Sequence, residues 1–199
     1  MRGSNYFITV FWISSLLIAC GNTSNENKSQ EDSSYRIYNL EKTGWKSKSI
    51  THSFKDISYK ATAVPIEYYI LKNNTDQTIQ AIDSISKTYE NERIIEFEFE
   101  QIQSKDLLDS EFTGLDYDKS VNYMASIIKN DFLVVTESND TIPCSGVHFE
   151  RHFKVSPFNR ILLYFEGIAP SENIQLIYQD RLFQQGIFKF KFNETPFKT

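Results

Sequence analysis

The chain has 199 residues, of which 40% are hydrophobic and 24% charged, and this balance excludes both a disordered tail and a protein with many membrane spans. Its formal net charge of −5 disfavours nucleic acid as a partner, and its 2 cysteines are too few for a disulfide scaffold. At about 100–200 residues per domain, the length indicates a single folded domain.

Residues 1–19 have the features of a signal peptide. Arg2 supplies a positive charge at the start, and the run from Tyr6 to Ala19 is mostly apolar. As a helix this run would span about 21 Å, which is less than the thickness of a bilayer hydrocarbon core. We therefore expect a signal peptide rather than a permanent membrane span.

The signal segment ends in the sequence Leu17-Ile18-Ala19-Cys20. This sequence resembles the lipobox of bacterial lipoproteins, although Ile18 is bulkier than the commonest residue at its position. The resemblance implies that the Cys20 thiol carries a diacylglycerol, that the chain is cut before Cys20, and that the new amino group is acylated. The alternatives are an ordinary cleaved signal peptide, or an uncleaved anchor with a cysteine there by chance.

A lipid on Cys20 makes the membrane an expected partner, because two or three acyl chains hold a protein stably on a bilayer. Gly21 stands where the family's common inner-membrane retention signal has Asp. If the cell has two membranes, the resemblance therefore favours the outer one.

The rest of the chain divides into a tether and one domain. After Cys20, residues 21–34 have no apolar side chain that could be buried, so residues 20–34 are predicted to form a flexible, lipidated tether. Aromatic and β-branched residues recur from Tyr35 onward, which predicts a single β-rich globular domain over residues 35–199.

Strand-like and helix-like patterns follow one another along this domain. The predicted strands are Ile66–Leu71 after Pro65, Ile94–Glu100, a hairpin of Asp131–Thr136 with a strand from Thr141 onward, Arg160–Phe165, Ile174–Tyr178 and Phe188–Phe192. The predicted helices are Asp76–Glu90, with Thr75 as its cap, and Asp118–Ile128, where β-branched residues leave a strand possible. These elements predict an α+β domain, mainly an antiparallel β-sheet or sandwich with one or two short helices.

Two of the predicted strands carry opposite charges on one face and phenylalanines on the other. Ile94–Glu100 places Phe97 inward and a ladder of Glu96, Glu98 and Glu100 outward, whereas Phe188–Phe192 places lysines outward. Charge matching favours these strands as neighbours in one sheet.

The ladder of Glu96, Glu98 and Glu100 does not fit a catalytic site. General acid–base catalysis needs carboxylates on opposite sides of a substrate, so the ladder is interpreted as a face exposed to solvent.

The most suggestive chemical cluster is Cys144, His148, Glu150 and His152. On a regular strand these residues share one face, but the two histidines would lie about 13 Å apart, too far to bind one metal ion. We therefore interpret them as a solvated polar face, and we expect no metal and no cofactor.

Cys144 could act as a nucleophile if a histidine lay within hydrogen-bond reach. A lone cysteine is more often a small buried hydrophobe, and Pro143 and Gly146 beside it indicate a local irregularity such as a bulge.

Two further groups of residues have an ordinary and a functional interpretation. One is an acidic segment that lacks the residue spacing of a calcium-binding loop and is interpreted as a solvated loop. Its acidic residues are Asp106, Asp109, Glu111, Asp116 and Asp118.

The other is a group of aromatic residues. Trp45, Tyr68 and Tyr69 could form a stacking platform for sugars or peptides, although such residues more often belong to a core.

Together these patterns favour a non-enzymatic, membrane-anchored envelope protein that binds a protein or a glycan. The alternatives are a structural subunit of an envelope assembly and, less favoured, a thiol-dependent or hydrolytic enzyme that uses Cys144. Cys20 is the only residue to which a specific modification is assigned.

Overall fold

The computed structural model describes residues 48–74, 78–151, 156–169 and 172–193. The predicted signal peptide, lipobox and tether therefore lie outside the described residues, as do Trp45 and His152. No helix within the described ranges is long and apolar enough to span a membrane.

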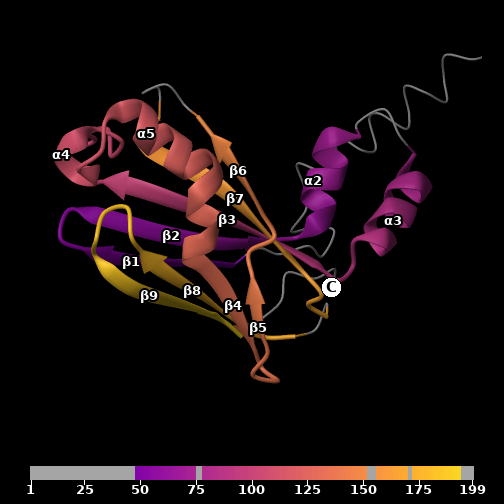
Figure 1. Ribbon diagram of the computed structural model, residues 1–199. Helices are drawn as coiled ribbons and strands as arrows, with labels where there is room; N and C mark the ends of the chain where they lie inside the picture. Colours follow the sequence, from indigo (N-terminus) through magenta and orange to yellow (C-terminus); the bar gives the residue numbers. More distant parts are fainter. Residues whose placement is uncertain (1–47, 75–77, 152–155, 170–171, 194–199) are drawn as a thin grey trace, which may run out of the picture.

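Two antiparallel sheets pack face to face (Figure 1). The large sheet has the order β1 (Lys48–Phe54), β2 (Ile57–Val64), β3 (Glu92–Gln101), β7 (Phe158–Glu166) and β6 (Gly146–Glu150). The small sheet has the order β5 (Thr141–Pro143), β4 (Phe132–Thr136), β8 (Ile174–Asp180) and β9 (Gly186–Phe192). The predicted class, α+β with mainly antiparallel sheet in a sandwich-like arrangement, is confirmed.

Aromatic side chains from both sheets fill the space between them. Phe97 of β3 and Phe190 of β9 are fully buried, and their ring centroids lie 5.3 Å apart in an edge-to-face contact. Phe132 stacks on Tyr178 at 4.4 Å. The inward direction predicted for the phenylalanines of both strands is confirmed, because a side-chain period of two residues is a local property of any extended strand.

The predicted adjacency of the glutamate and lysine strands is wrong. β3 belongs to the large sheet and β9 to the small one, so their phenylalanines meet across the core while their charged faces point to opposite sides of the sandwich. The cations beside Glu98 are Lys60 of β2 and Arg160 of β7 instead of lysines of β9.

The segment after Pro65 is a helix, α2 (Ile66–Asn73), so the predicted strand over Ile66–Leu71 is wrong. Its aliphatic and aromatic residues suit a strand by propensity alone. Glu67 in the first turn and Lys72 in the last complement the helix dipole, and the helix buries Ile70 and Leu71, so its packing outweighs propensity.

The second helix, α3 (Ile79–Thr88), starts later than predicted. Its cap is Thr78, whose hydroxyl accepts a hydrogen bond from the backbone N–H of Ala81, whereas Thr75 and Asp76 lie outside the described residues. Figure 1 shows α2 and α3 together at one end of the molecule, far from α4 and α5.

A second helical region lies between β3 and β4. It consists of α4 (Ser110–Thr113), α5 (Tyr117–Asn122), a π-helical turn η1 (Tyr123–Ile127) and a 3₁₀ turn η2 (Ile128–Asp131). The helical interpretation of Asp118–Ile128 is confirmed, and Met124 and Ile128 of this stretch are buried in the main core.

Neither β1 nor β2 was predicted from the sequence. They pair as an antiparallel hairpin, and β2 alternates between buried residues such as Tyr59 and Ala61 and half-buried polar ones such as Lys60. The predicted hairpin of β4 and β5 is confirmed, with Asn139 in a left-handed conformation in its turn.

Candidate functional site

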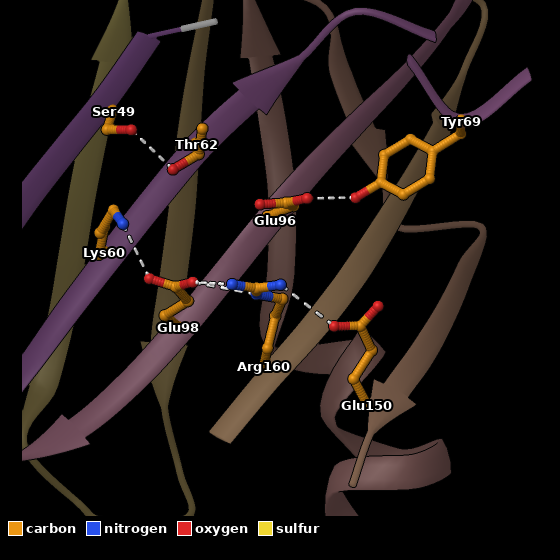
Figure 2. A network of polar contacts seen from close by, with 8 residues as sticks. All are labelled: Ser49, Lys60, Thr62, Tyr69, Glu96, Glu98, Glu150 and Arg160. Carbon is orange, nitrogen blue, oxygen red and sulfur yellow. Dashed lines mark hydrogen bonds and ion pairs between the residues drawn. The ribbon is translucent and has the colours of Figure 1, made fainter. Parts of the chain in front are cut away.

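The outer face of the large sheet carries a row of alternating charges. The strand register aligns Lys60, Glu98, Arg160 and Glu150 across β2, β3, β7 and β6. Lys60 Nζ lies 2.9 Å from Glu98 Oε2, Arg160 Nη2 lies 2.6 Å from Glu98 Oε1, and Arg160 Nη1 lies 3.4 Å from Glu150 Oε2. Figure 2 shows these side chains linked across the strands.

Glu98 is the centre of this row, and its side chain is only 12% exposed. Burial alone would raise the pKa of Glu98, but hydrogen bonds from Lys60 and Arg160 lower it overall. For Arg160, burial disfavours the charged form, yet the hydrogen bonds to Glu98 raise its pKa. Glu98 and Arg160 are therefore both charged at neutral pH, and their contacts link the strands in the middle of the face.

A second row ties helix α2 to the sheet. Glu96 accepts a hydrogen bond from the Tyr69 hydroxyl, and Thr62, its neighbour in the register, exchanges a 2.8 Å hydrogen bond with Ser49 (Figure 2). Burial and the contact with Glu96 raise the pKa of Tyr69, so its hydroxyl remains a donor. Tyr69 thus fixes the side of α2 that faces the sheet.

The helices α2 and α3 form a unit of their own above this face. Ile70, Leu71 and Ile82 make a small cluster that is separate from the core between the sheets. Between these helices and the sheet lies an open groove of about 750 Å³. We call it the α2–α3 groove, and its lining residues are Ile66, Tyr69, Ile70, Lys72, Asn73, Asn74, Ile85, Tyr89, Glu92, Ile94, His148, Glu150, Leu162 and Tyr164.

Aliphatic and aromatic side chains dominate the lining of the groove. Tyrosine rings come from a helix (Tyr69), from the end of α3 (Tyr89) and from a strand (Tyr164). The ring of Tyr164 lies against Gly146 of β6, where a Cβ would contact it at 3.6 Å. Burial first, and then Glu150, raise the pKa of Tyr164, which keeps its hydroxyl protonated.

The cluster of Cys144, Glu150 and the histidines is divided by the fold. His148 and Glu150 line the α2–α3 groove, as expected for a polar strand face. Cys144 instead belongs to the core, and His152 lies outside the described residues. The interpretation of these residues as one solvated strand face is wrong for Cys144, because β5 and β6 belong to different sheets and the chain crosses between the sheets at Cys144. The separate interpretation of Cys144 as a small buried residue beside a local irregularity is confirmed.

The environment of Cys144 disfavours nucleophilic chemistry. The residue is 8% exposed, and its thiol donates a hydrogen bond to the Gly146 carbonyl. Burial raises the pKa of this thiol, which lowers the fraction of reactive thiolate. Within the described ranges, no group of three or more His, Cys, Asp or Glu side chains could hold a metal ion.

The acidic segment between β3 and α5 has structural roles. Asp106 accepts hydrogen bonds from the Leu108 N–H and the Tyr117 hydroxyl, and Asp116 caps α5 by accepting from the Lys119 N–H. Glu111 pairs with Lys105 at the surface.

Of the aromatic residues considered for a stacking platform, Tyr69 lies in the α2–α3 groove, and the ring of Tyr68 makes an edge-to-face contact with it at a centroid distance of 5.1 Å.

Sequence patterns did not reveal Tyr89, Leu162 or Tyr164 as members of one site. Leu162 and Tyr164 share the outer face of β7, which the strand pattern could have indicated, but the groove exists only because α2 folds over the sheet as a helix.

Comparisons of the chain with protein-family models, with curated proteins and with solved structures found no match.

Proposed function

We propose that the protein is a lipid-anchored protein of the cell envelope, placed on the outer membrane where the envelope has two membranes. Its sandwich domain serves as a non-enzymatic binding module for an envelope protein or glycan. The observation that carries this proposal is the α2–α3 groove, which combines an aliphatic floor with three tyrosine rings and has a volume of about 750 Å³.

The chemistry of the groove supports binding in preference to catalysis. Its volume falls in the range of about 300–1,000 Å³ that is usual for ligand sites, and its lining is mainly apolar with a few polar groups that can orient a ligand. Two carboxylates at or beside the groove already have structural partners: Glu150, in its lining, pairs with Arg160, and Glu96 accepts a hydrogen bond from Tyr69. These contacts hold the groove in a preformed shape, which lowers the entropic cost of binding.

The predicted anchor supports the same proposal. A tether of residues 21–34 would have a root-mean-square reach of about 20 Å, enough to present the domain to partners near the membrane without fixing its orientation. The burial of Cys144 weighs against the alternative in which this residue serves as a catalytic nucleophile.

Crosslinking in intact cells tests this function with matched variants. Tyr89→Ala removes a ring from the groove at a residue that is 41% exposed, and Phe54→Ala removes a similarly exposed ring, 45%, outside the groove. We expect the wild-type chain and Phe54→Ala to capture the same discrete partner, protein or glycan, and Tyr89→Ala to lose most of it. Capture that is equal for all three chains would contradict the proposal, and a fixed stoichiometric complex of several subunits would favour the structural alternative.

A further inference from the structure

Carboxylates outnumber cations on the outer face of the large sheet. The strand register places on this face the carboxylates of Glu92, Glu96, Glu98, Glu100, Glu150 and Glu166, together with the cations of Lys60 and Arg160. Both of these cations are already paired with Glu98. The face therefore has excess negative charge, and part of it borders the α2–α3 groove.

Two carboxylates, Glu92 and Glu150, and one cation, Lys72, line the groove, and Glu150 is already paired with Arg160. Glu92, which lines the groove, lies directly opposite Glu166 in the antiparallel pair of β3 and β7. Two like charges in this arrangement destabilise a sheet. Burial and the charge of Glu166 raise the pKa of Glu92, and in the described part of the chain neither carboxylate forms an ion pair. A cation bound here would relieve this repulsion.

The aromatic wall of the groove is also suited to cations. Lys72 Nζ of α2 lies 6.0 Å from the ring centroids of both Tyr68 and Tyr69, so these rings already attract one ammonium group. Tyr89 and Tyr164 present further rings inside the groove. The aliphatic floor of Ile94 and Leu162 suits the apolar stem of a lysine or arginine side chain.

We propose that the α2–α3 groove binds a basic segment of a partner protein, with a lysine or arginine side chain placed between the tyrosine rings and the Glu92–Glu166 pair. This inference rests on the proposed function and specifies its partner. Charge complementarity favours a basic protein segment over a neutral glycan, because only the former neutralises the opposed carboxylates.

Fluorescence polarisation with a labelled heptalysine peptide tests this proposal on the full chain. The variant Glu92→Gln/Glu166→Gln removes the opposed pair, whereas Glu100→Gln/Glu137→Gln removes the same charge at exposed positions outside the groove. We expect the first variant to weaken peptide binding by about tenfold and the second by less than about twofold. Tyr89→Ala should also weaken it, and heptaglutamate should not bind.

If both double variants lose the same affinity for heptalysine, the binding is general electrostatic attraction to the protein surface, and the proposal is overturned. Binding of a neutral chitin hexasaccharide without binding of heptalysine would overturn it as well, but would leave the proposed function standing with a glycan as the partner. If capture of the partner in cells depends on Tyr89 while heptalysine fails to bind, only the proposal that the partner contributes a basic segment is refuted. If capture does not depend on Tyr89, the proposed function itself is refuted.

Discussion

Asp180 illustrates how single residues organise the interior of this sandwich. Its carboxylate accepts hydrogen bonds from the Tyr59 and Tyr178 hydroxyls, both at 2.9 Å, and from the backbone N–H groups of Phe183 and Gln185. Burial, followed by the charge of Asp180, raises the pKa of both tyrosines, so both remain donors. One carboxylate thus joins β2, β8 and the loop that leads to β9.

Replacing Asp180 by Ala should destabilise the fold strongly. The change leaves two buried hydroxyls and two backbone N–H groups without their acceptor, and we expect a loss of about 3–5 kcal/mol in the free energy of unfolding. Urea denaturation followed by circular dichroism measures this loss. The exposed Glu100→Ala is the control, and a loss below about 1 kcal/mol for Asp180→Ala would show that the cluster contributes little.

Glu98 gives the outer face a pH dependence. Because its pKa in the fold is below the ordinary 4.5, its contribution to stability is present above that pH and is lost as the pH falls through the lowered value. Glu98→Gln should therefore lower the free energy of unfolding by about 1–3 kcal/mol at pH 7. This loss is larger than the one expected if the ladder of Glu96, Glu98 and Glu100 were only a solvated face. Urea titrations of both chains should show this difference shrinking towards pH 3.5. A difference that is constant with pH would mean that the charge of Glu98 is not responsible.

At the scale of elements, strand direction and strand neighbours have different origins. The alternation in β3 and β9 is local, and it correctly predicts Phe97 and Phe190 as core residues. Which strand lies beside which depends on the whole chain, and charge matching placed these two strands wrongly in one sheet. Similarly, α2 has strand-like residue types but is a helix, because its apolar residues pack on α3 and Tyr69 bonds to Glu96.

The two faces of β3 and β9 should differ sharply in their sensitivity to mutation. Phe97→Ala or Phe190→Ala removes a fully buried ring and should cost about 3–5 kcal/mol. Lys189→Gln changes an exposed side chain and should cost less than about 1 kcal/mol. Thermal and urea unfolding measure both effects. A mild effect of Phe97→Ala would contradict the packing of the rings across the core.

Tyr69 should control how firmly α2 is held on the sheet. Tyr69→Phe removes the hydroxyl that donates to Glu96 while keeping the ring. We expect faster amide hydrogen exchange in α2 and α3, whose own cluster is small, and unchanged exchange in β3 and β7. Mass spectrometry of exchanged peptides measures this. Unchanged exchange in α2 would show that packing alone holds the helix.

For the molecule as a whole, the proposed lipid on Cys20 would hold the domain at a membrane. Cys20→Ser should abolish lipidation and release the protein from the membrane, because the apolar run before it is too short for a stable span. Membrane fractionation combined with intact-mass analysis checks this. The Cys144→Ser chain is the matched control and should remain in the membrane fraction. A Cys20→Ser chain that stays in the membrane fraction with an unchanged mass would exclude the lipoprotein interpretation.

Features that depend on neighbouring residues could be predicted before the fold was known. The alternation of apolar and polar residues identified the inward faces of β3 and β9, the set of predicted elements indicated the α+β class, and the residues around Cys20 carry the prediction of a lipid anchor. Three features could be seen only in the folded chain: the partners of Glu98, the separation of Cys144 from His148, and the groove between α2 and the strands β3, β6 and β7. These features arise when segments far apart in the chain bury apolar surface against each other. A periodic pattern predicts which side of a segment is buried, but it does not predict which other segment covers that side.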